Sequence, residues 1–189
     1  RDRGKRPRVG VCGTAVERAQ QMAVLPQSSS LSFGLRVEEI VALGRLPTEG
    51  LVTKEEDQKI IREAMERTDI AHLATRSYMT LSGGEKLRTH LSRTIAQILG
   101  AGSSASKILL LDEPNSALDH PGEIALKNVI NYCKNKGKLV LVVTHRRSVL
   151  SYSDSILDLS DVTGPMLYKK EEYFKKFSSK EDFDQKFNF

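Results

Sequence analysis

The sequence lacks any long hydrophobic run. No stretch of about 18 consecutive apolar residues occurs, so we expect no transmembrane helix. The basic stretch 1–8 has no apolar segment behind it, so we expect no secretory signal there. With 39% hydrophobic and 28% charged residues in 189 positions, the composition is typical of one globular domain with a buried core.

Cysteine is scarce, and no metal-ligand pattern replaces it. Cys12 and Cys133 are far apart in the chain and form no C-x-x-C pair. This spacing argues against a disulfide framework or a zinc site, and it favours a reducing compartment. No pair of the four histidines has the spacing of metal ligands.

Acidic residues are fewer than basic ones, which gives a net charge of +5. Five of the basic residues are clustered between Arg1 and Arg8. A nucleic-acid arm and a solvated chain end both fit such a cluster. No aromatic residues alternate with these charges and no RNA- or DNA-binding module is present, so we expect no nucleic-acid partner.

Strand and helix patterns alternate along the chain. Val24–Gln27 is typical of the end of a strand, and 31–80 is mainly helical, with Ser82 opening a further helix. The apolar runs 108–111 and 139–143 predict strands buried on both faces, and 121–136 between them predicts a helix. A further strand is predicted at 155–159. This alternation predicts a parallel sheet in an α/β fold.

Residues 164–189 carry aromatic residues among alternating charges. Phe174 and Phe177, like Phe183 and Phe187, stand at helical spacings. A docked C-terminal helix, a partner-binding tail and a frayed chain end all fit this segment.

Two carboxylates follow the apolar run 108–111. A strand there would deliver Asp112 and Glu113 to the C-terminal edge of the sheet, where ligands bind in open α/β folds. Asp112 could hold magnesium, and Glu113 could act as a general base toward water. Acidic residues that only cap a strand end are the alternative. His145 follows the next predicted strand, so it should reach the same edge and could hydrogen-bond a phosphate.

Residues 81–85, which we call the signature segment, read Leu-Ser-Gly-Gly-Glu directly ahead of an amphipathic helix. Ser82, Gly83 and Gly84 would place a hydroxyl and free backbone N–H groups at a helix N-terminus, which suits a phosphate. A serine cap followed by flexible turn residues is the alternative. Asp119, just before Pro121, fits the cap of a second helix.

Four segments in this order resemble the ATP-binding subunit of an ABC transporter. They are 81–85, 108–114, 116–119 and 142–145, and the resemblance runs from about Ala23 to Leu159. It implies a P-loop NTPase-like parallel sheet with flanking helices and an inserted helical subdomain. It also implies hydrolysis of ATP with Mg²⁺ as cofactor.

The resemblance also assigns roles to the candidate residues. Asp112 would hold magnesium, Glu113 would be the base and His145 the switch histidine. Gln27 would be the Q-loop glutamine, which senses magnesium and the attacking water. Ser82, Gly83, Gly84 and Glu85 would bind the γ-phosphate of ATP on the second subunit of a head-to-tail homodimer, and Asp119 would cross that same interface.

Residues 27–45 are similar to the ATP-binding subunits of hemin importers, and more broadly of iron-siderophore and cobalamin importers. The similarity implies that the helical subdomain contacts an integral-membrane permease dimer, within a complex that includes a substrate-binding protein. It places the chain at the cytoplasmic face of the cell membrane as a peripheral subunit. Residues 146–149 look more like an exporter's pattern, so the direction of transport stays open.

The phosphate loop of this family, Gly-x-x-x-x-Gly-Lys-[Ser/Thr], occurs nowhere in the 189 residues. Gly10–Thr14 contains glycines but no lysine. Because Arg1 stands in place of Met, we expect an N-terminally truncated chain that cannot form a complete nucleotide site. A degenerate, non-hydrolysing regulatory subunit and a non-transport ABC protein are the alternatives. The predicted parts are a catalytic-lobe remnant (1–30), the helical subdomain (31–98), the catalytic lobe (99–163) and a tail of unassigned role (164–189).

Overall fold

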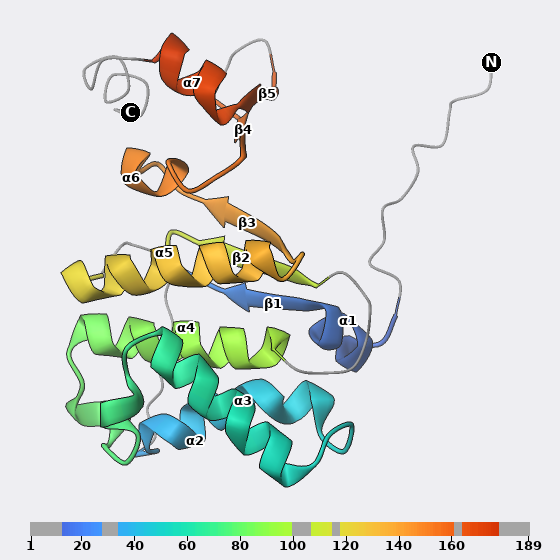
Figure 1. The fold of residues 1–189 in the computed structure, drawn as a ribbon, viewed down its shortest axis with the longest axis vertical. Coiled ribbons are helices and arrows are strands. Elements are labelled where there is room, and N and C mark those ends of the chain that lie inside the picture. The colour runs from blue at the N-terminus through green and yellow to red at the C-terminus, as the bar shows by residue number, and fades with distance from the viewer. Residues whose placement is uncertain (1–12, 28–33, 100–106, 115–117, 161–163, 178–189) are drawn as a thin grey trace.

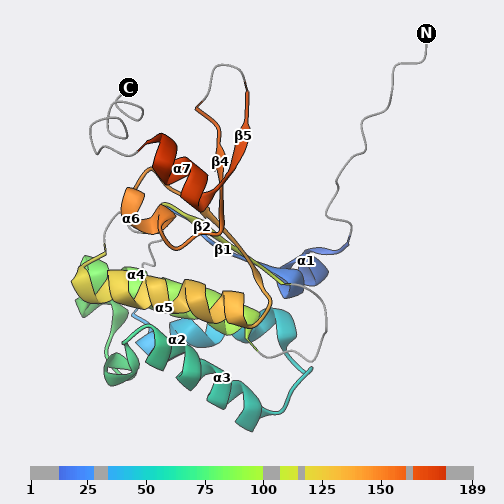
Figure 2. The same ribbon diagram turned by 45° about the horizontal axis from the view of Figure 1, so that its top comes forward.

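The computed structural model describes residues 13–27, 34–99, 107–114, 118–160 and 164–177 (Figure 1). A small parallel sheet lies between a helical part and a C-terminal hairpin unit. Both views place the helices α2 (Val37–Ala42), α3 (Lys54–Arg67) and α4 (Gly83–Ile98) on one side of the sheet, and the hairpin unit, residues 155–176, on the other (Figure 2). None of the described helices is long and apolar enough to cross a membrane.

The sheet contains β1 (Met22–Leu25), β2 (Ile108–Asp112) and β3 (Leu139–Val143) in the order β1-β2-β3. Both pairings are parallel, which confirms the predicted α/β class. The register aligns Leu25 with Leu111, and Leu111 with Val142. The three strands therefore end together at one edge.

The prediction that β2 and β3 are buried on both faces is wrong for the described chain. Leu109 and Leu111 are fully buried, but Leu139, Leu141 and Val143 of β3 are about half exposed. The helices α4 (Gly83–Ile98) and α5 (His120–Asn135) supply the packing against the sheet. An apolar run does not reveal whether both of its faces will be covered.

The strand predicted at 155–159 is present as β4 (Ser155–Asp158), but it does not extend the parallel sheet. It pairs antiparallel with β5 (Met166–Lys169), and α6 (Arg147–Leu150) lies between β3 and β4. The helix α7 (Lys170–Lys176) packs Tyr173 against this hairpin. A docked helix, one of the three alternatives for the tail, is therefore present at 170–176, whereas Phe183 and Phe187 lie outside the described residues.

The helical part follows the predicted order. It contains α2 (Val37–Ala42), η1 (Leu43–Thr48), α3 (Lys54–Arg67), η2 (Ala71–Leu73) and η3 (Tyr78–Thr80), and α1 (Ala15–Gln21) precedes β1. Thr53 caps α3 by accepting a hydrogen bond from the N–H of Glu56. The short η1 lies directly on α4. The two approach so closely at Gly44 that a Cβ there would overlap the main-chain oxygen of Arg93.

A buried arginine fixes this contact. Arg45 is 4% exposed and donates to the carbonyl oxygens of Ala96 and Leu99 at 2.7 and 2.6 Å. Its Nε lies 2.7 Å from the Asp57 carboxylate. Two carbonyls at the C-terminal end of α4, which have no partner within the helix, are thereby satisfied.

Candidate active site

The carboxyl-end edge of the sheet brings predicted residues together from three separate segments. The parallel register aligns the last residues of β1, β2 and β3. Gln27 follows β1, Asp112 ends β2 with Glu113 directly after it, and His145 follows β3. The edge beyond the strand ends is the usual ligand-binding edge of an open α/β sheet.

Glu113 and His145 are in direct contact at this edge. The Oε1 of Glu113 accepts from the backbone N of His145 at 3.1 Å and lies 2.9 Å from its Nδ1. Because a carboxylate can only accept, Nδ1 carries a hydrogen and Nε2 is the ring nitrogen left for a ligand. The histidine side chain is 62% exposed and that of Glu113 only 15%.

The backbone of Glu113 has an unusual conformation that aims its side chain. Its N–H extends the sheet by donating to the Val143 oxygen at 2.9 Å, and its φ is 43°. A left-handed conformation is uncommon for a residue with a Cβ, and such residues concentrate at functional sites. Here the turn sends the carboxylate sideways, toward the segment that follows β3.

Two carboxylates lie at this edge, and carboxylate oxygens are among the ligands that magnesium commonly takes. The Oε2 of Glu113 is buried and has no hydrogen-bond partner within the described part of the chain. Asp112, half-buried beside it, offers a second carboxylate. Within the described ranges no group of three or more His, Cys, Asp or Glu residues could hold a metal ion. Magnesium commonly takes one or two carboxylates together with phosphate oxygens and water, and Asp112 suits the first of these.

The signature segment forms the first turn of α4. Ser82 is the N-cap, its Oγ accepts from Glu85 N at 3.3 Å, and Glu85 Oε2 accepts from Ser82 N at 2.7 Å. The hydrogen bonds from the Ser82 backbone and side chain lower the pKa of the Glu85 carboxyl, so that it stays ionised. Glu85 therefore serves its own helix cap.

Gly84 and Asp119 form the second contact between predicted residues. Gly84 is buried, and a Cβ there would lie 2.9 Å from the Cγ of Asp119. Asp119 caps α5 through Gly122 N at 2.9 Å, as predicted. Within the described ranges no hydrogen bond or ion pair joins this contact to the Glu113–His145 pair. Ser116 and Ala117, and residues 28–33 after Gln27, lie outside the described residues.

A family model described as ABC transporter matches residues 7–116, which is more than half of the chain. The chain belongs to the ABC transporter family. The expectation drawn from the four motifs is thereby confirmed.

Relatives in this family include hemin import ATP-binding proteins named HmuV. The protein of Pseudomonas fluorescens Pf-5 is 46% identical over 145 residues, which cover 76% of this chain and 55% of that protein. That of Pseudomonas aeruginosa PAO1 is 42% identical over 158 residues, which cover 83% and 60%. The chain therefore spans little more than half the length of these relatives.

Solved ABC structures share the fold. A dimeric ATP-binding cassette, MJ0796, in a post-hydrolysis state bound to ADP and Pi, is 26% identical with a TM-score of 0.63. The match covers 75% of this chain and 60% of that one. A bacterial Atm1-family ABC exporter with ATP bound, 21% identical, has a TM-score of 0.64 over 90% of this chain and 29% of that one. The latter likeness concerns the fold alone.

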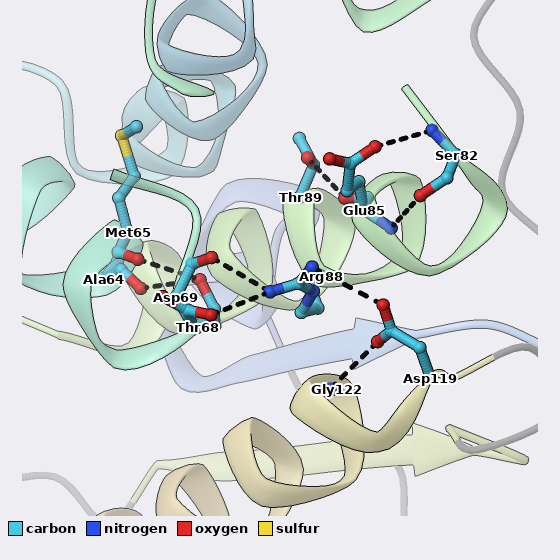
Figure 3. Close-up of polar contacts among 10 residues, drawn as sticks. All are labelled: Ala64, Met65, Thr68, Asp69, Ser82, Glu85, Arg88, Thr89, Asp119 and Gly122. Atoms are coloured by element: carbon cyan, nitrogen blue, oxygen red, sulfur yellow. Dashed lines mark hydrogen bonds and ion pairs between the residues drawn. The ribbon is translucent and has the colours of Figure 1, made fainter. Parts of the chain in front are cut away.

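The sequence marks Arg88 only as a basic residue after the signature segment and does not reveal its burial or its partners. Arg88, on α4 after the signature segment, is buried, and its guanidinium lies beside both Asp69 and Asp119 (Figure 3). A single arginine on an amphipathic helix normally indicates a solvated face. The spacing gave one signal that Arg88 belongs with the signature segment. Arg88 lies four residues after Gly84 and therefore on the same face of the helix.

Proposed function

We propose that this chain is the signature and catalytic part of an ATPase subunit that drives transport through a membrane permease. One observation carries the proposal: the 2.9 Å contact between Glu113 and His145, beside Asp112 at the edge of the sheet. Packing alone does not account for this arrangement, because it holds Glu113 in a left-handed conformation and the buried Oε2 has no hydrogen-bond partner within the described residues. A degenerate, non-hydrolysing subunit would not need such an arrangement.

Each residue at this edge would have a separate role in phosphoryl transfer. Glu113 uses Oε1 to orient His145, which leaves Oε2 to accept a hydrogen from the attacking water. His145 presents Nε2, which can donate to a γ-phosphate oxygen when protonated. Asp112 would hold magnesium, which when bound neutralises phosphate charge. Gln27 follows β1 at the same edge and is exposed, so its amide can contact the water or the ion.

The signature segment would act on the ATP of a second copy. Ser82 and Gly83 are exposed at the N-terminus of a helix of 16 residues, where free N–H groups and a partial positive charge favour a phosphate. They make no hydrogen bond to the Glu113–His145 pair within the described chain. A head-to-tail dimer would bring the two halves together, and the MJ0796 cassette, which is dimeric, supports the presence of a second copy.

The transported substrate would be hemin or another iron complex. The names of the relatives support this choice, as does the resemblance of residues 27–45. The permease dimer would contact the helical subdomain at the cytoplasmic face of the membrane, where Leu43, Leu46 and Leu51 are exposed at 38%, 60% and 60%. A substrate-binding protein would complete the assembly.

The test is the Glu113→Gln variant of the complete protein, since this chain spans only part of its relatives. We expect turnover of ATP to fall by roughly 100-fold or more while ATP binding is kept, because the amide cannot accept a proton. Glu171→Gln, an exposed acid on α7, is the matched control and should hydrolyse ATP at the wild-type rate. Normal turnover by Glu113→Gln would refute the proposed role.

A further inference from the structure

Arg88 joins three elements through one guanidinium group. Its side chain is only 7% exposed and extends from α4 between α3 and α5 (Figure 3). Nη1 donates to the backbone oxygen of Asp69 at 2.9 Å and lies 3.2 Å from its carboxylate. Nη2 lies 3.6 Å from the Asp119 carboxylate. The three elements are therefore tied together near the N-termini of α4 and α5.

The Asp119 carboxylate is held from several directions. One oxygen accepts from Gly122 N and caps α5, and the other faces Arg88. The group also packs on Gly84, where no side chain would fit. Any movement of the Asp119 turn would therefore displace the first turn of α4, which carries the signature segment.

On its other side Arg88 holds the turn that follows α3. Asp69 has a φ of 54°, and its carbonyl oxygen is fixed by the arginine. The adjacent Thr68 hydroxyl donates to the Ala64 oxygen at 3.0 Å and so closes the end of α3. The link therefore reaches from Asp119 through α4 into the helical subdomain.

Stability alone does not explain an arginine at this position. The charge is buried, and Nε has no hydrogen-bond partner within the described part of the chain. Replacing a buried charged group by a well-packed apolar one is often neutral or stabilising. What an apolar side chain cannot do is bridge two acidic groups on different elements, for which the planar guanidinium is suited.

We propose that Arg88 is a positioning residue that holds the signature segment and the Asp119 turn in one fixed arrangement. The proposal rests on the proposed function, in which both segments meet the nucleotide of a second subunit. Without the bridge each segment would still form its own helix cap, but their relative position would vary. Hydrolysis would then slow. Initial binding of ATP would change little, because the signature segment contacts only ATP that is already bound to the second subunit.

The experiment compares Arg88→Met with wild type in the complete protein. Amide exchange is followed by mass spectrometry in peptides that cover 82–88 and 118–124, because Lys86 N and Gly122 N hydrogen-bond to Ser82 and Asp119. We expect exchange in both peptides to rise about tenfold with little change in melting temperature. We expect kcat to fall roughly 10- to 100-fold with the KM for ATP almost unchanged, because the loss is one of alignment.

Arg67→Met is the matched control, since the Arg67 guanidinium stacks on Tyr132 and pairs with Glu63 rather than with Asp69 or Asp119. It should leave exchange at 82–88 and 118–124, and kcat, at wild-type values. Arg88→Lys keeps the charge but reaches only one acidic group. Its amide exchange and its kcat should therefore lie between those of wild type and Arg88→Met. This variant replaces Arg88→Met in the experiment if the latter does not fold. Unchanged exchange, or an unchanged kcat, in the Arg88 variants would overturn the proposal. A wild-type protein without ATPase activity would refute the proposed function instead, and exchange would still decide the role of Arg88.

Discussion

Oε1 of Glu113 faces both the ring Nδ1 and the backbone N of His145, at 2.9 and 3.1 Å. The contact fixes the tautomer of the ring, and the other oxygen of Glu113 is buried and has no hydrogen-bond partner among the residues that the structure describes. Two segments that are 32 residues apart in the sequence thus contribute to a single site at the edge of the sheet. In the proposed function this pair orients the water that attacks the phosphate, beside the carboxylate of Asp112.

The first prediction concerns His145. In the complete protein His145→Ala should lower kcat for ATP roughly 100-fold, because a donor aimed at the developing phosphate charge is lost. The KM for ATP should change little. His72→Ala, at an exposed position on η2, is the control and should keep the wild-type kcat in a steady-state assay. Equal rates for the two variants would remove His145 from the site.

A second prediction concerns packing in the helical subdomain. Gly44→Ala should destabilise the protein by about 1–3 kcal/mol, because the new Cβ would overlap the Arg93 carbonyl of α4. Gly34→Ala, where no atom lies within 4 Å of the added Cβ, is the control. Urea unfolding should separate the two variants. A midpoint shared with wild type would show that η1 does not pack on α4 in this way.

The third prediction follows from the cap of α4. The pKa of Glu85 is lowered by its hydrogen bonds from Ser82, so its stabilising effect is complete at pH values above the unfolded pKa. That effect is lost as the pH falls through the folded pKa. In thermal unfolding, the melting temperature of wild type should therefore exceed that of Glu85→Gln at pH 7. This gap in melting temperature should narrow toward pH 4 and below. A gap independent of pH would mean that the charge of Glu85 plays no part.

The fourth prediction uses the buried thiol of Cys133. Burial raises the pKa of this thiol to about 11, so almost none of it is thiolate at pH 8. In a Cys12→Ser background the native protein should react with a thiol reagent only at the rate at which it unfolds. Rapid reaction under native conditions would contradict the burial of α5 against the core.

Local signals in the sequence predicted most elements because their causes are local. Caps such as Thr53 and Ser82 fixed helix starts, and the run 108–111 fixed the strand that delivers Asp112 and Glu113. The partner of β4 could not be predicted, because an apolar run is compatible with either a parallel or an antiparallel neighbour. The burial of Arg88 could not be predicted, because it depends on Asp69 and Asp119, which are distant in sequence.

The most direct test of the account asks whether two copies share each site. Ser82→Arg and Glu113→Gln, each inactive alone in the complete protein, are mixed in equal amounts and assayed for ATP hydrolysis. In a mixed head-to-tail dimer one site keeps both an intact Glu113 and an intact Ser82, so random pairing should restore about a quarter of wild-type turnover. A mixture no more active than its components would contradict a site built from the catalytic edge of one copy and the signature segment of the other.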